Sequence, residues 1–96
     1  MTITEYIYKT ADFFRPGAVE VKVGRIAGGA RITCVYNDRA EYDSFVKGAV
    51  ASHADAATAL GKALGELKAS GRIKSARQYG AARSDGRIEI RMDFAL

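Results

Sequence analysis

The stretch that decides the fold is RIEIRMDF, residues 87–94. Apolar side chains alternate there with charged ones, which is the two-residue period of a strand with one face on a core and the other in water. The charged positions are Arg87, Glu89, Arg91 and Asp93. We therefore expect an antiparallel strand whose outer face carries ions.

The dipeptide Asp85–Gly86 predicts a hairpin that joins this strand to the segment before it. Asp-Gly is typical of a two-residue type I′ turn. With these two residues at the turn, the register places Tyr79 beside Met92 on the apolar face. The outer surface of the hairpin is then expected to hold four cations: Arg72, Lys74, Arg87 and Arg91.

A second hairpin is predicted over residues 18–36. Its two strands, 18–27 and 30–36, flank Gly28–Gly29, and both glycines can adopt the positive φ of a tight turn. Gly24 interrupts the alternation of the first strand and predicts a bulge or a close approach of another backbone segment. The returning strand should direct three side chains inward: Ile32, Cys34 and Tyr36.

Residues 3–9, ITEYIYK, predict a further strand, because β-branched and aromatic residues dominate them. Apolar side chains would occupy both of its faces, so one face would be core and the other exposed at a sheet edge. Tyrosine and phenylalanine beside arginine are typical of a protein-binding hot spot. The candidate binding residues here are Tyr6, Tyr8, Phe13, Phe14 and Arg15. Alternatively, the segment folds over the rim of the core.

Residues 53–70 give the clearest helical pattern, with Ser52 and Asp55 as its start and Gly71 as its end. A row of small residues at four-residue spacing, Ala57, Gly61 and Gly65, favours close packing of this helix on its own sheet, although a partner could also approach there.

Residues 39–51 are either a second helix or a further strand. Aromatic and aliphatic residues fall at helical spacing, but Asn37–Asp38 could equally turn the chain into a strand. The 96 residues form a single domain, and at 48% hydrophobic and 27% charged they have a globular composition. The predicted fold class is α+β: an antiparallel sheet of five or six strands with one main helix on a face.

The net charge of +4 is placed unevenly along the chain. Seven of the 15 basic residues but only three of the 11 acidic ones lie from Lys68 onward. Such a basic half favours attraction to phosphate or to an acidic protein surface, and it is also typical of a solvated, solubilising face.

The sequence contains no motif typical of a catalytic, metal-binding or cofactor-binding site. One histidine, His53, and one cysteine, Cys34, in separate elements cannot build a metal site, and no cofactor motif occurs. There is no G-x-S-x-G elbow and no phosphate-binding loop. Because no catalytic motif occurs, we expect that the protein is not an enzyme. Because the sequence has neither a secretory signal nor an apolar run of about 18 residues, we expect a reduced, cytoplasmic protein without a membrane span.

Three functions remain as hypotheses. The first is a non-catalytic binding protein that acts as an inhibitor or adaptor of a larger protein or ribonucleoprotein complex. Small chains without motifs from phages or mobile elements, including anti-CRISPR proteins, often act in this way. The second is a nucleic-acid-binding module that uses the basic C-terminal hairpin. The third is a small dimeric α+β enzyme or ligand carrier with a pocket between sheet and helix, for which a defined pocket near His53 would be evidence. The oligomeric state of the chain is not predicted, and a homodimer is possible for the other two functions as well.

Overall fold

The computed structural model describes residues 1–96 as an α+β domain of two layers. The elements in chain order are α1 (Ile3–Phe14), the 3₁₀ turn η1 (Arg15–Gly17), β1 (Glu20–Ile26), β2 (Gly29–Tyr36), α2 (Arg39–Ser52), α3 (Ala54–Ala69), β3 (Ser75–Ala82) and β4 (Ile88–Ala95).

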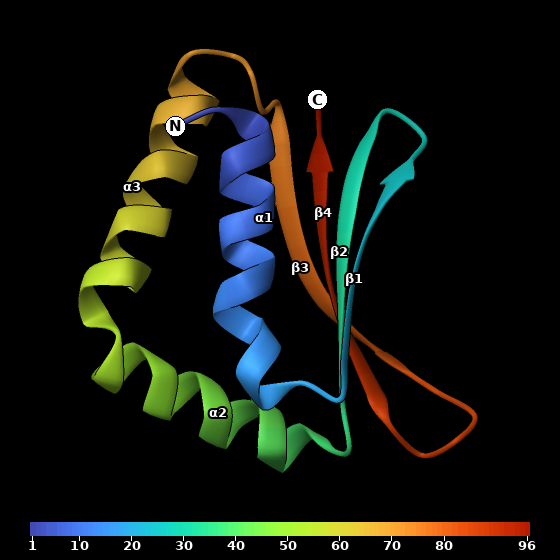
Figure 1. The fold of residues 1–96 in the computed structure, drawn as a ribbon. Coiled ribbons are helices and arrows are strands. Elements are labelled where there is room, and N and C mark those ends of the chain that lie inside the picture. Colours follow the sequence, from blue (N-terminus) through green and yellow to red (C-terminus); the bar gives the residue numbers. More distant parts are fainter.

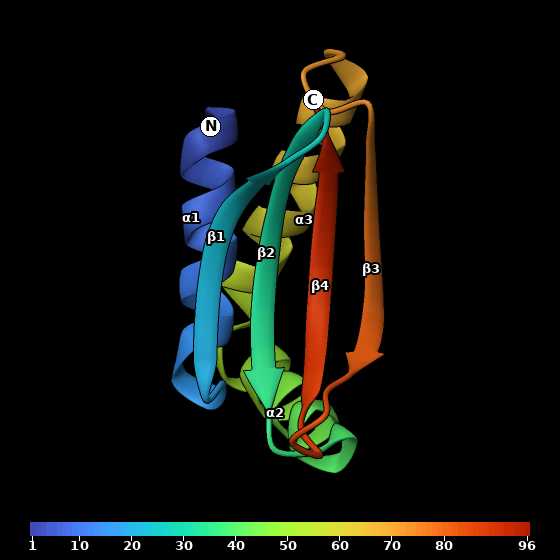
Figure 2. The same ribbon diagram turned by 90° about the vertical axis from the view of Figure 1, so that its right-hand side faces the viewer.

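The four strands form one antiparallel sheet in the order β1-β2-β4-β3. All three helices lie on the same side of it (Figure 1), so the strands in Figure 2 face the viewer with nothing in front of them. The α+β class is therefore as predicted, whereas the five or six strands are wrong. Two of the segments that could have supplied strands, 3–9 and 39–51, are helical.

Residues 3–9 belong to α1, which corrects the strand predicted there. Thr2 and Glu5 form a capping box: the Thr2 hydroxyl accepts from the Glu5 N–H at 3.1 Å, and the Glu5 carboxylate accepts from the Thr2 N–H. This box satisfies two N–H groups that a helix start leaves free. The buried residues of α1 then recur at helical spacing: Tyr6, Ile7, Thr10 and Ala11.

The open question over residues 39–51 is answered by α2. The Asp38 side chain accepts from the Glu41 N–H at 2.8 Å and caps its start. The predicted helix over 53–70 is confirmed as α3, but Ser52 does not cap it, since Ser52 ends α2 and His53 separates the two helices. Gly71 follows α3 with a φ of 75°.

The first hairpin turns one residue earlier than predicted. Ala27 and Gly28 make the turn, with Gly28 at a φ of 76°, and Gly29 pairs with Ile26. Gly29 is required for a different reason: a Cβ there would lie 1.8 Å from the Phe94 carbonyl oxygen. The bulge predicted at Gly24 is also wrong, because the register runs through it without interruption. The alternative of a close backbone approach is wrong as well, since a Cβ at Gly24 would meet nothing within 4 Å.

The second hairpin has a three-residue turn in place of the predicted two-residue one. The Arg83 N–H donates to the Arg87 carbonyl at 3.0 Å, and the Gly86 N–H donates to the Arg83 carbonyl at 3.2 Å. A type I′ turn needs two residues at positive φ, and in this turn only Gly86 has one. The extra residue shifts the register by one, so Tyr79 lies opposite Arg91 and points to the outer face.

The core lies between the helices and the covered face of the sheet. Its most buried large side chains are Tyr36, Ile32, Ile73 and Ile90. The Tyr6 ring meets Phe94 edge-on, with centroids 5.6 Å apart. No helix has the length and apolar character needed to cross a membrane.

Candidate binding interface

The side of the sheet without helices (Figure 2), which we call the uncovered face, carries the outward residues of all four strands. By the strand register these include Glu20, Lys22 and Gly24 on β1, Arg31, Thr33 and Val35 on β2, Glu89, Arg91 and Asp93 on β4, and Arg77, Tyr79 and Ala81 on β3. Although Val35 points outward, it is only 2% exposed, because the longer side chains around it cover the sheet.

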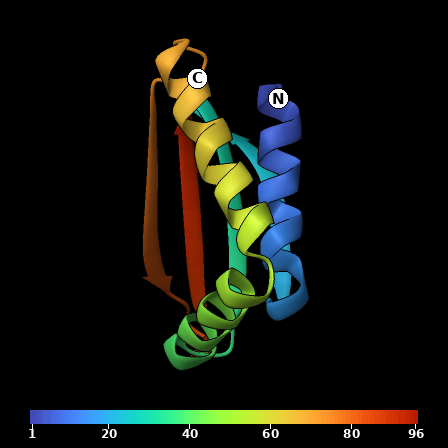
Figure 3. The same ribbon diagram turned by 90° about the vertical axis from the view of Figure 1, so that its left-hand side faces the viewer.

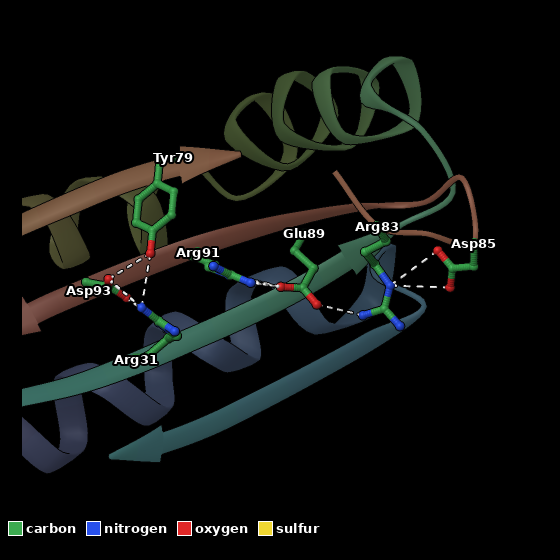
Figure 4. Close-up of polar contacts among 7 residues, drawn as sticks. All are labelled: Arg31, Tyr79, Arg83, Asp85, Glu89, Arg91 and Asp93. Atoms are coloured by element: carbon green, nitrogen blue, oxygen red, sulfur yellow. Dashed lines mark hydrogen bonds and ion pairs between the residues drawn. The ribbon is translucent and has the colours of Figure 1, made fainter. Parts of the chain in front are cut away.

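Arg31, Asp93 and Tyr79 form one hydrogen-bonded cluster across three strands (Figure 4). Arg31 Nε and Nη2 donate to the two Asp93 carboxylate oxygens at 2.7 and 3.0 Å. The Tyr79 hydroxyl donates to Asp93 at 2.9 Å and accepts from Arg31 at 3.1 Å. The Arg31 guanidinium lowers the pKa of Asp93 below its usual value. The cluster is a bidentate, charge-assisted contact, the strong kind of surface ion pair.

A second ionic chain runs towards the β3–β4 turn (Figure 4). The Glu89 carboxylate accepts from Arg83 at 2.7 Å and from Arg91 at 2.9 Å. Arg83 also meets Asp85 at 3.3 Å. The Arg87 backbone N–H donates to Asp85 and lowers the pKa of that carboxyl. Both carboxylates of this set of ion pairs, Glu89 and Asp85, thus pair with arginines of the protein itself.

Tyr79 lies among arginines. The Arg77 guanidinium lies over its ring at 4.7 Å from the centroid, and the Arg91 guanidinium is 6.0 Å away. Arg77 takes part in no ion pair of the structure. A partly buried tyrosine held in place by arginines is a pre-organised group, and these two residue types dominate interface hot spots.

The uncovered face and its margin carry an excess of unpaired positive charge. The four acids there, Glu20, Asp85, Glu89 and Asp93, all form ion pairs. The cations on or beside the face that form none are Arg72, Lys74, Arg77 and Arg87. A partner with acidic side chains would therefore meet attraction at the rim of the face.

The four cations predicted on the hairpin surface do not share one strand face. Arg91 lies on the uncovered face, and Arg87 lies in the turn before β4. Arg72 and Lys74 are exposed in the loop between α3 and β3, where the Lys74 N–H donates to the Ala95 carbonyl. They flank the face and are not part of the strand.

The five aromatic and basic candidates of the N-terminal segment are divided between core and surface. Tyr6 is 5% exposed, so its expected position at a sheet edge is wrong. Phe14 packs on the core, next to Phe45, and Phe13 is half-buried. Tyr8 and Arg15 are exposed, and Arg15 pairs with Asp12 at 3.3 Å. The helical form of α1 separates residues that a strand would have aligned.

Sequence reasoning missed Arg31, Arg77, Tyr79 and Asp93 as binding candidates. The signal that could have found Tyr79 is the spacing of the turn: one more residue between the strands moves it to the charged face. Arg31 and Asp93 lie 62 positions apart, and only the pairing of β2 with β4 brings them together.

Other parts of the molecule lack a convergent constellation. Cys34 is fully buried, and burial raises the pKa of its thiol to about 12. His53 lies exposed at the bend between α2 and α3, in a shallow hollow lined by the consecutive residues 51–56. No group of three or more His, Cys, Asp or Glu side chains lies close enough to hold a metal ion.

The small-residue row of α3 does not pack on the sheet, contrary to the interpretation we favoured. A Cβ at Gly61 or Gly65 would meet nothing within 4 Å, and both glycines are exposed. A shallow apolar groove of about 400 Å³ lies between α1 and α3, lined chiefly by Phe13, Ala56, Ala59 and Leu60.

Comparison of the chain with protein-family models, with curated proteins and with solved structures found no match.

Proposed function

We propose that the protein is a non-catalytic binding protein that docks its uncovered face onto a larger protein with acidic side chains, and so acts as an inhibitor or adaptor of that protein's complex. The observation that carries the proposal is Tyr79, held between arginines at the side of the sheet that no helix covers. Rigid presentation lowers the entropy that the side chains lose on binding.

The mixed charge of the face favours a protein over a phosphate backbone. Glu89 and Asp93 lie on β4, one of the two central strands. A nucleic acid that crosses the sheet would bring phosphates close to both carboxylates. A protein can place acids against the rim cations and polar or apolar groups over the centre, which is the usual anatomy of an interface.

The test is capture from a cell lysate with the wild-type protein, followed by titration of the protein retained. Arg77→Glu reverses a cation that has no ion pair to lose, and should weaken binding by about tenfold or more, as expected for a hot spot. Lys47→Glu is the matched control: it makes the same charge change at an exposed position of α2 and should leave affinity unchanged. Capture of nothing, or equal effects of the two variants, overturns the proposal.

A second candidate function is binding of single-stranded nucleic acid. Sheet-type RNA readers stack bases on exposed aromatics next to basic residues. The register observed here places Tyr79 on the charged face, where the predicted register had no aromatic. This candidate predicts an affinity for single-stranded RNA or DNA that falls steeply with salt and is reduced in Tyr79→Ala. Absence of binding to single-stranded RNA or DNA at low ionic strength would rule out this candidate function.

A further inference from the structure

The two edge strands of the sheet are protected to different degrees. Free edges can pair with other chains, and native proteins block them with charges or with covering elements. At the β1 edge, α1 lies over the strand (Figure 3), and Arg25 places a charge at a register position on the helix side. Glu20 and Lys22 add charges on the opposite side.

The β3 edge has fewer of these devices: on its helix side, Gln78 donates to the Tyr42 hydroxyl of α2 and the Arg39 side chain lies near Gly80. The eight residues of β3, SARQYGAA, include one charge, no proline and no bulge. In Figure 3, β3 lies to the side of α3, outside the helix layer. Three of its residues at helix-side register positions, Gln78, Gly80 and Ala82, are exposed.

The hydrogen-bond pattern shows which backbone groups of β3 are free. Arg83 and Arg87 form a hydrogen-bonded pair in the register that β3 and β4 share. Because such pairs alternate along antiparallel strands, the odd-numbered residues of β3 direct their N–H and C=O groups at β4. The residues that direct them at the open edge are Ala76, Gln78, Gly80 and Ala82.

We propose that the β3 edge is an interface on which the β3 strand of a second copy pairs antiparallel, about a two-fold axis at Tyr79. This register places Ala76 opposite the partner's Ala82 and Gln78 opposite the partner's Gly80. All four free residues then form backbone bonds, and no other symmetric register lets all four do so within the eight-residue strand.

Side-chain complementarity supports a second copy as the occupant. Gln78 meets a glycine, and Arg77 faces the partner's Ala81, so no like charges lie opposite one another. Tyr79 faces the partner's Tyr79 across the axis. Opposite residues of an antiparallel pair share a face, so the two uncovered faces join into one surface with the two tyrosines at its centre. The inference does not depend on the proposed function.

A cysteine cross-link tests the register. Tyr79→Cys places two thiols directly opposite each other in a non-hydrogen-bonded pair, at about the Cα separation that a disulfide accepts. Mild oxidation should give a covalent dimer. In the matched variant Arg77→Cys, on the same face of β3, the two thiols would be four residues apart, about 13 Å, and should not join. Wild type is the background control, because Cys34 is buried.

Sedimentation of the uncross-linked protein tests the interface itself. Wild type should associate to a dimer in the micromolar range. Gly80→Pro removes an edge N–H without touching the β4 ladder and should shift the protein to monomer, whereas Arg25→Pro at the β1 edge should not. A wild type that stays monomeric, or cross-linking of Arg77→Cys as efficient as that of Tyr79→Cys, overturns the proposal.

Discussion

The covered and the uncovered face of the sheet are built from the same strands by opposite means. On β2, Ile32, Cys34 and Tyr36 point into the core and are fully buried. Arg31 and Thr33 alternate with these residues along the strand and lie on the uncovered face. Burial of apolar area stabilises the fold on one side, whereas the other side holds polar groups in fixed positions. We therefore expect the stability of the fold to depend mainly on the covered face and the proposed recognition on the uncovered face.

The largest expected difference between the faces is the loss of stability when a side chain is truncated. Ile32→Ala should lower the free energy of unfolding by about 2 to 5 kcal/mol, because Ile32 is fully buried and truncation leaves a cavity. Thr33→Ala, one residue along on the uncovered face, should cost less than about 1 kcal/mol. Urea denaturation measures both. Similar losses for the two variants would contradict the division of the sheet into a stabilising and a recognition face.

The next largest effect on stability is expected for the Arg31–Asp93 ion pair. Asp93→Asn removes the charge that two guanidinium nitrogens contact, and should lower the free energy of unfolding by about 1 to 2 kcal/mol. Asp12→Asn breaks an exposed pair on α1 and should cost no more than about 0.5 kcal/mol. If the two substitutions cost the same in thermal unfolding, the cluster on the uncovered face is not a pre-organised unit.

Part of the stability that the Arg31–Asp93 ion pair contributes should be lost in acid. The pKa of Asp93 is lower in the folded protein than in the unfolded chain, because Arg31 donates to its carboxylate. Its stabilising contribution is therefore present above about pH 4 and is lost as the pH falls through the folded pKa. The stabilities of wild type and Asp93→Asn should converge below pH 4. A gap that stays constant from pH 6 to pH 2 would refute this.

The smallest effects should have opposite signs on the two faces. Tyr79→Phe removes a hydroxyl with two hydrogen-bond partners and should destabilise by about 1 kcal/mol. Tyr36→Phe removes a buried hydroxyl that has no partner, so stability should be unchanged or rise by up to about 1 kcal/mol. Calorimetric melting of the two variants in one buffer compares them directly. A loss at Tyr36 as large as that at Tyr79 would contradict the assignment of the faces.

The sequence predicted those elements in which one local rule dominated. The alternation over residues 87–94 was sufficient for β4, and the helical period with Gly71 was sufficient for α3. In α1, β-branched and aromatic residues favoured a strand, whereas the capping box of Thr2 and Glu5, which we overlooked in the sequence, starts a helix. The conflict is resolved by burial, since a helix places Tyr6 and Ala11 together on the core.

The proposed binding surface was harder to predict because it depends on register. The type I′ turn expected at Asp85–Gly86 has one residue fewer than the turn in the structure. The resulting error in register placed Tyr79 on the wrong face of the sheet in the prediction. The contacts between Arg31 and Asp93 join strands from opposite ends of the chain. No local pattern carries that pairing, so the outward directions of Arg31 and Asp93 were predictable, while that of Tyr79 and the formation of the cluster were not.

Hydrogen exchange of the protein bound to its captured partner tests the central claim, that recognition occurs on the uncovered face, most directly. We expect binding to slow exchange in peptides from β3, β4 and the turn between them, residues 75–95, and to leave α1 and α2 unchanged. Protection confined to the helices, with residues 75–95 exchanging as in the free protein, would contradict the claim.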